Sequence, residues 1–385
     1  MHLLTLGFMT MVMLGALLQL LAVVARAPVP RVQRLAALAH GALTLGTAAF
    51  AAGLALNIGP LLVAGLGGLL GALVPFVIAA AGAAVRSPLR HPAVGGMRWA
   101  LAALAVTVLL GVAATGRHTG MALAGPWLSE VHLAWGLVGW TGLLVMGVAQ
   151  QVVPMLHGTP AYPEWAGRAL VPAGGLALLA WSLAAALGVD AARTGTGLVG
   201  AAVLACFAVL TLARLVRRRR AATDASIYYW WLGMGALLGC VVLWAVRQAG
   251  AWPGAPERLD APIAALYIVG FAVSLISGML YRIVPFLVWL HLQRARGWPT
   301  PWARRSPMPN MMVLIPPRAM AGQFTAHALG VALTLPATLR PGAWAYAAAL
   351  ILAGAWLGLA LNLIGAVRRG RAAGAAIGAR GASSA

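Results

Sequence analysis

A membrane-embedded motif occurs three times in this chain, about 131 residues apart. Its copies read LGFMTMVMLGALLQLLAVV from Leu6, VGWTGLLVMGVAQQVVPML from Val138 and VGFAVSLISGMLYRIVPFL from Val269. Each copy holds two glycines eight residues apart, which are Gly7 and Gly15, Gly139 and Gly147, and Gly270 and Gly278. A fixed period of this kind predicts an internally repeated architecture. The period has room for about four membrane helices, so we predict a block of four helices used three times.

The composition indicates that this architecture lies in a membrane. Apolar residues make up 62% of the 385 residues and charged residues only 9%, a mixture that is not typical of a soluble protein. Apolar stretches of about 18 residues or more recur along the chain, and each is long enough to cross the hydrocarbon layer. We therefore predict an all-α polytopic membrane protein whose immediate partner is the lipid bilayer. The net charge of +21 does not indicate nucleic-acid binding, because the arginines lie in loops between helices.

The apolar stretches predict eleven membrane helices in one transmembrane domain, 1–385. They lie near 3–25, 32–56, 59–84, 96–116, 130–156, 168–188, 194–216, 227–249, 262–291, 319–337 and 343–367. Repeats over 1–129, 130–260 and 261–371 then hold four, four and three helices, followed by a disordered cytoplasmic tail over 372–385. One helix of a complete threefold scheme is absent. The proline-rich loop 292–318 is predicted to hold a short interfacial helix near its end.

The loops differ in charge in a way that predicts the topology. Arginine clusters follow the first, third, seventh, ninth and last predicted helices, whereas the intervening loops hold few basic residues. By the positive-inside rule, the odd-numbered helices run from the outer to the inner side and the C-terminus is cytoplasmic. We expect the inner membrane of a bacterium.

Polar residues occupy one position of the motif in every copy. Four residues after the second glycine stand Gln19, Gln151 and Arg282. Polar groups in a bilayer are costly and usually face protein or water, so these three are predicted to face a pseudo-threefold interior near the cytoplasmic side. Simple hydrogen bonding between helices is the alternative.

The motif resembles helices of the haem-copper oxidase catalytic subunit, especially its nitric-oxide-reductase and C-type branch. The phrases GVAQQVVP and GMLYRIVP are similar to phrases that end helices of that subunit. HLLTLGFMTMVMLG, HLAWGLVGWTGLLVMG and GMLYRIVPFLVWLHL resemble uncharacterised NnrS-like and oxidase-subunit-I-like membrane proteins. This resemblance implies an oxidase-like fold, with the helices that begin near residues 3, 130 and 262 in the places of the family's second, sixth and tenth helices. The missing helix would be the family's first.

The resemblance is incomplete at the residues that carry the family's chemistry. His132 corresponds to a copper-ligand histidine, two residues out of register, and His2 corresponds to a low-spin haem ligand. The stretch 262–267 contains no histidine where the family has two haem ligands, and the helix near 168–188 lacks a His-His pair. We therefore do not expect the full oxygen-reducing site.

Four histidines are candidate ligands, since imidazole binds haem iron and copper. His2 and His132 lie at the outer ends of their helices, where we predict a metal site. His40 and His327 lie about eight residues into corresponding helices of the first and third repeats, both after alanine. An ionisable residue inside a membrane indicates function, with a structural hydrogen bond as the alternative role.

The leading hypothesis is thus an inner-membrane protein that binds b-type haem, copper or both through His2, His40, His132 and His327. Its role would be in nitric-oxide or respiratory metal metabolism, with respiratory-chain or nitric-oxide-related membrane proteins as partners. The alternatives are a transporter or respiratory-complex assembly factor without a redox centre, and a structural subunit whose metal sites have decayed. The substrate, and whether the protein is an enzyme, are not indicated by the sequence.

Overall fold

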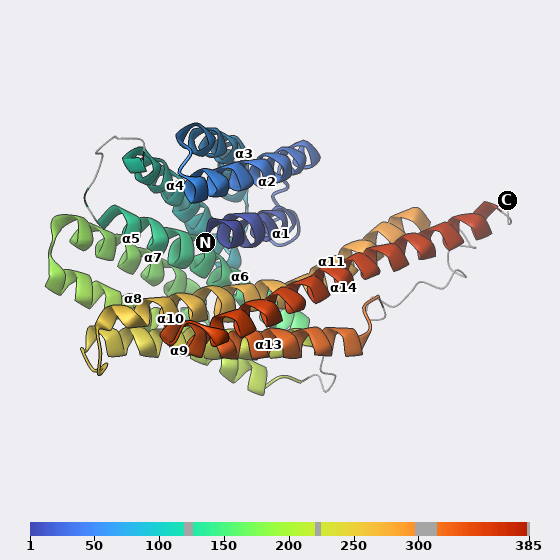
Figure 1. The fold of residues 1–385 in the computed structure, drawn as a ribbon. Coiled ribbons are helices and arrows are strands. Elements are labelled where there is room, and N and C mark those ends of the chain that lie inside the picture. Colours follow the sequence, from blue (N-terminus) through green and yellow to red (C-terminus); the bar gives the residue numbers. More distant parts are fainter. Residues whose placement is uncertain (119–124, 126, 220–224, 297–313, 383–385) are drawn as a thin grey trace. The chain divides into compact units, whose positions relative to one another are not determined.

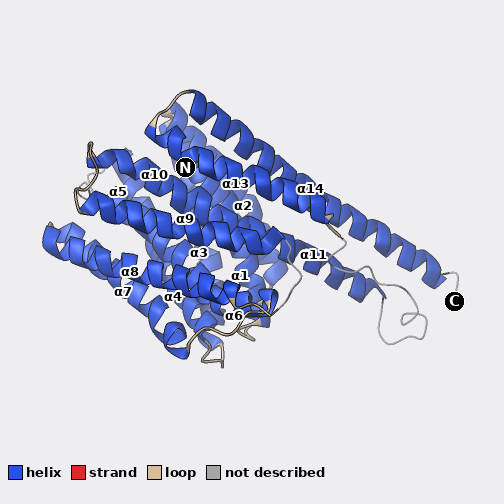
Figure 2. Cartoon of the chain, turned by 90° about the horizontal axis from the view of Figure 1, so that it is seen from below, coloured by secondary structure: helices blue, strands red, loops and turns tan. Residues whose placement is uncertain are grey.

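The computed structural model describes residues 1–118, 125, 127–219, 225–296 and 314–382. All the regular secondary structure in this part of the chain is helical (Figure 2). The chain forms two compact units, Met1–Arg220 and Ala221–Ala385, which are described separately below.

The first unit contains the helices up to α8 (Figure 1). Its elements are η1 (Leu3–Thr10), α1 (Met11–Val23), α2 (Val32–Leu56), α3 (Gly59–Arg86), α4 (Pro92–His118), α5 (Trp127–Ala134), η2 (Trp135–Gly142), α6 (Leu143–His157), α7 (Glu164–Leu187) and α8 (Asp190–Val216). The second unit has the elements α9 (Ala225–Gln248), η3 (Pro256–Leu259), α10 (Asp260–Ala265), η4 (Leu266–Val273), α11 (Ser274–Arg296), α13 (Pro317–Leu339) and α14 (Ala343–Ala382).

The prediction of a polytopic α-helical membrane protein is confirmed. Within the described residues, ten helices are long and apolar enough to cross a membrane. The remaining predicted helix, 319–337, is also present, as α13. It is not among the ten because Arg318, Gln323 and His327 lower its mean hydropathy. Residues 372–382, for which we predicted a disordered tail, are the end of α14. The short helix predicted in the loop 292–318 falls largely outside the described residues.

Short connections force neighbouring helices into antiparallel pairs, as between α2 and α3, which lie side by side in Figure 1. α2 ends at Leu56, and Asn57 adopts a left-handed φ of 55°, a conformation that asparagine tolerates better than most residues. Pro60 then lies in the first turn of α3, where its missing N–H is not needed. The sequence LNIGP therefore reverses the chain between two apolar stretches.

Each copy of the sequence motif begins with the same unusual local structure. The three π-helical segments η1, η2 and η4 are each eight residues long. Each begins four residues before the first glycine of its copy, at Leu3, Trp135 and Leu266. π-helical turns are rare and often occur at functional sites. The sequence repeat thus has a counterpart in backbone conformation, which the sequence did not predict.

We call a helix that contains one copy of the sequence motif a motif helix. In the second and third copies, the helix that precedes the motif helix packs closely against it. α4 packs on η2 and α6 in the first unit, and α9 packs on η4 and α11 in the second. The predicted repeat boundaries at 130 and 261 separate each of these motif helices from the preceding helix on which it packs. The boundary between the two compact units, at residue 220, instead lies before α9, so α9 and its motif helix belong to one unit. The local packing therefore groups the second and third motif helices with the helix before them as well as with those after them.

Candidate functional site

His2 and His132 are neighbours in the first unit, although 130 residues separate them in sequence. Their ring centroids are 6.4 Å apart, and the ring planes are inclined by 36°. The Phe50 ring of α2 packs edge-on against His2 with a centroid distance of 5.3 Å. The structure thus brings these two candidate ligands close together, from positions just before η1 and within α5.

A backbone carbonyl fixes the orientation of the His132 ring. Its Nδ1 lies 3.1 Å from the carbonyl oxygen of Thr107 in α4, and this oxygen can only accept, so Nδ1 carries the proton. The lone pair of Nε2 is then available to a metal. Histidine ligands in metalloproteins commonly donate their other N–H to a carbonyl or carboxylate in this way.

His2 is half-buried and lies just before the first membrane span. Burial, and secondarily the neighbouring His132, lower the pKa of His2 to about 4. Its imidazole is therefore neutral at pH 7, and a neutral imidazole is the form that binds metals.

The spacing of the two rings fits two ligands on opposite sides of one metal. With a metal–nitrogen bond of about 2.0 Å, two imidazoles placed in this way have centroids about 6 Å apart. Two imidazoles at this spacing would be able to hold a haem iron or a copper ion between them. Among the described residues, no group of three or more His, Cys, Asp and Glu side chains converges on one point. The donor set therefore fits haem iron or copper better than a four-ligand zinc site.

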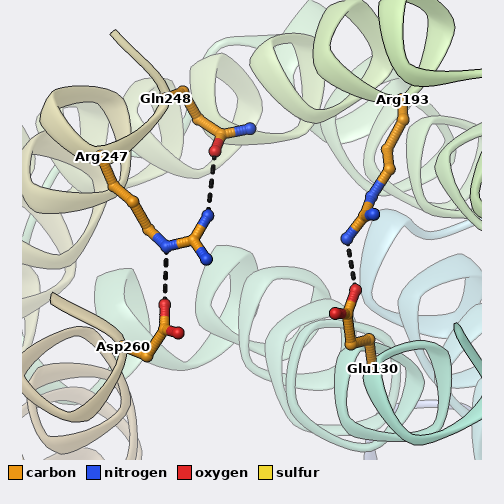
Figure 3. A network of polar contacts seen from close by, with 5 residues as sticks. All are labelled: Glu130, Arg193, Arg247, Gln248 and Asp260. Carbon is orange, nitrogen blue, oxygen red and sulfur yellow. Dashed lines mark hydrogen bonds and ion pairs between the residues drawn. The ribbon is translucent and has the colours of Figure 1, made fainter. Parts of the chain in front are cut away.

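Glu130 lies two residues before His132 but pairs with an arginine instead. It accepts a charge-assisted hydrogen bond from Arg193 of α8 (Figure 3). Arg193 also lies over the Trp181 ring, 5.2 Å from its centroid. In the second unit, Asp260 at the start of α10 pairs with Arg247 of α9, with 2.7 Å between Oδ1 and Nε (Figure 3). Both carboxylates are in the first turn of a helix, where the helix dipole favours negative charge.

The other two candidate histidines do not join this pair. In the first unit, Nδ1 of the exposed His40 lies 3.2 Å from the Met11 sulfur. In the second unit, the fully buried His327 shares a 2.8 Å hydrogen bond between its Nε2 and the Ser274 hydroxyl. His327 Nδ1 has no hydrogen-bond partner in the described part of the chain.

His40 and His327 nevertheless occupy corresponding places. Met11 and Ser274 each stand four residues after the first glycine of their motif copy. The corresponding residue of the second copy, Leu143, faces Gly174, since a Cβ on Gly174 would lie 3.1 Å from Leu143 Cδ2. The sequences AHG, AGG and AHA around positions 40, 174 and 327 agree with this correspondence. The second copy therefore has a glycine where the other two have a histidine.

A buried polar cluster joins all four long helices of the second unit. Gln323 Oε1 of α13 accepts hydrogen bonds from the Tyr229 hydroxyl of α9 and, at 3.0 Å, from the Tyr281 hydroxyl of α11. Asn362 of α14 donates to the Tyr281 oxygen at 2.9 Å, and Gln323 donates to the Ala355 carbonyl at 3.1 Å. The sequence analysis did not identify this cluster, although each member is a polar residue within an apolar stretch.

The three polar positions of the motif have different surroundings. Gln19 and Gln151 are half-buried in the first unit. Arg282 in the second unit donates from Nε to the Ser226 hydroxyl at 3.1 Å, a bond between helices α11 and α9. Arg282 thus makes a hydrogen bond between helices, which was the alternative role for these positions. That all three residues face one pseudo-threefold interior stays a prediction.

Comparisons of the chain with family models, curated proteins and solved structures gave no match.

Proposed function

We propose that this multi-pass membrane protein holds a redox-active metal, haem iron or copper, between His2 and His132. The observation that carries the proposal is the 6.4 Å separation of the two ring centroids. The contact of 3.1 Å between His132 Nδ1 and the Thr107 carbonyl supports it, because it leaves Nε2 as a ligand.

A metal in this position would supply one-electron transfer. The residues of the chain would hold it and shield it: His2 and His132 as ligands, the Thr107 carbonyl as the group that orients His132, and Phe50 as an apolar wall against His2. Because both histidines would be used to hold the metal, electron transfer fits this site better than oxygen or nitric-oxide turnover.

The broader assignment rests on the sequence resemblance. It comprises a threefold oxidase-like arrangement in a bacterial inner membrane with a cytoplasmic C-terminus, and a role in nitric-oxide or respiratory metal metabolism. The matching π-helical segments η1, η2 and η4 support the repeated arrangement.

The test is a spectrum and an elemental analysis of the purified full chain. We expect either a Soret band that reports haem or copper that co-purifies in stoichiometric amount, and we expect His132→Ala to lose it. His291→Ala is the matched control, because His291 is exposed and bonds only within its own helix, to the Leu287 carbonyl. Absence of both signals from the wild-type protein would overturn the proposal and favour the transporter or assembly-factor alternative. Equal metal contents in wild type and His132→Ala would exclude this site.

A further inference from the structure

The helix α14 has the length and the aromatic residues of a helix that passes through a bilayer and continues beyond it. It is 40 residues long, or about 60 Å at 1.5 Å per residue, whereas the hydrocarbon layer is about 30 Å thick. Trp344 and Tyr346 are exposed near its start, where such side chains are typical of the membrane interface. Arg368 follows Tyr346 by 22 residues, which is roughly 33 Å, so Arg368 lies at the opposite interface.

One exposed face of α14 is apolar along the membrane-spanning part and becomes basic at this interface. Its exposed apolar side chains are Leu350, Leu357, Leu361 and Ile364. Arg368 and Arg371 are also exposed and continue the same face, because each step along this series is three, four or seven residues. An exposed face of a membrane helix meets lipid, so the two guanidinium groups lie where the hydrocarbon ends and the headgroups begin.

The neighbouring helix α11 marks the same level of the bilayer. A Cβ on Gly370 of α14 would collide with the Val288 side chain of α11, so these two residues are level. Trp289 follows Val288, and its ring stacks on that of Phe286 with 6.4 Å between the centroids. A tryptophan at the end of an apolar stretch is typical of the interface. Arg371, one residue beyond Gly370, therefore lies at headgroup level by this second measure as well.

The two arginines of this face have no acidic partner in the part of the chain that the structure describes. The printed ion pairs of these residues do not include Arg368 or Arg371, and 261–385 contains no Asp or Glu. Their neighbour Arg369 differs, because its Nε donates a hydrogen bond of 2.8 Å to the Leu314 carbonyl. Arg369 thus has a structural partner, whereas the two guanidinium groups of the exposed face are available to an anion from outside the chain.

We propose that Arg368 and Arg371 bind the phosphate group of an anionic phospholipid at the membrane surface. Guanidinium groups bind phosphate through charge-assisted hydrogen bonds that are often bidentate. The occupant is a lipid rather than a free anion, because the exposed apolar side chains of α14 lead from the two arginines into the hydrocarbon layer, where the acyl chains of the same lipid would lie. The site rests on α14 as a membrane helix and is independent of the metal centre proposed above.

The test is binding of phosphatidylglycerol to the purified full chain in detergent, titrated and followed by native mass spectrometry. Phosphatidylcholine is the comparison lipid, because it carries a phosphate without net charge. We expect saturable binding of phosphatidylglycerol that Arg368→Gln/Arg371→Gln weakens about tenfold or more, and weaker binding of phosphatidylcholine that this variant leaves unchanged. The matched control is Arg258→Gln/Arg340→Gln, which removes two exposed arginines, one in η3 and one at the end of α13, and should bind phosphatidylglycerol like the wild type.

Three results would overturn the proposal. The first is equal affinity of the wild type and Arg368→Gln/Arg371→Gln for phosphatidylglycerol. The second is an equal loss in both double variants, which would show that only the net charge matters. The third is displacement of phosphatidylglycerol by inorganic phosphate at equal concentration, which would assign the two arginines to a free anion. The metal content of both variants should equal that of the wild type, so this test and that of the metal centre fail separately.

Discussion

The Trp140 indole nitrogen donates a hydrogen bond of 3.2 Å to the Thr10 hydroxyl oxygen, and both residues are buried. Thr10 ends η1 and Trp140 lies in η2, so this bond joins the two motif helices of the first unit. The same two helices carry His2 and His132. The bond therefore helps to hold the candidate ligands at their observed separation.

The hydrogen-bond contribution lost in Thr10→Val should exceed the one lost in Trp140→Phe. Valine leaves the indole N–H buried without an acceptor, which costs about 1–3 kcal/mol. In Trp140→Phe, the threonine hydroxyl can turn to a carbonyl of its own helix, so the hydrogen-bond term is smaller. Thermal unfolding in detergent compares the two, and the double variant should lose less than the sum. A strictly additive double variant would contradict a direct bond.

Gly147→Ala should lower stability, because the new Cβ would stand 2.5 Å from the Gly96 backbone, which cannot move aside like a side chain. Overpacking of this kind costs about 1–3 kcal/mol. Gly67→Ala in α3 is the control and should be neutral or slightly stabilising, since its Cβ meets nothing within 4 Å. Opposite shifts of the unfolding temperature for these variants would verify the close approach of α4 and α6.

Gln323→Leu should destabilise the second unit by removing the acceptor shared by Tyr229 and Tyr281. The Tyr229 hydroxyl would then be buried without a partner, which costs about 1–3 kcal/mol, whereas the Tyr281 oxygen keeps its hydrogen bond from Asn362. Gln248→Leu, at an exposed position at the end of α9, should change stability little. Thermal unfolding in detergent compares both variants, and equal stabilities would show that the cluster does not hold the four helices together.

Gly174→His should be poorly tolerated alone and better tolerated together with Leu143→Ser. The histidine side chain would meet Leu143, whereas serine would recreate the pairing of Ser274 with His327. The measurement is a double-mutant cycle, in which the expression level and unfolding temperature of the wild type, the two single variants and the double variant are compared. Absence of any rescue would show that Gly174 does not correspond to His327.

The eleven helices were predictable because each requires only a long apolar stretch, and their bounds agree within several residues except at the end of α14, which continues to Ala382. The pairing of His2 with His132 was proposed from their shared position at helix ends. The hydrogen bond of His132 to the Thr107 carbonyl was not predictable. Thr107 belongs to α4, and the packing of α4 decides which of its residues face His132. The same reason hid the contacts of Met11 with His40 and of Gln323 with two tyrosines, since hydropathy locates a helix in the membrane but does not determine which neighbour each side faces.

The π-helical segments change the directions in which the two glycines of a motif copy point around the helix axis. In a regular α-helix, eight residues turn through about 800°, which would point Gly7 and Gly15 in directions about 80° apart. The first glycine lies three residues before the last residue of each π segment. Wider turns of about 4.4 residues reduce the rotation over those three steps by about 55°. The two glycines then point in nearly the same direction. In the second and third copies, the backbone irregularity thus turns two small residues toward a single neighbouring helix, α4 or α9.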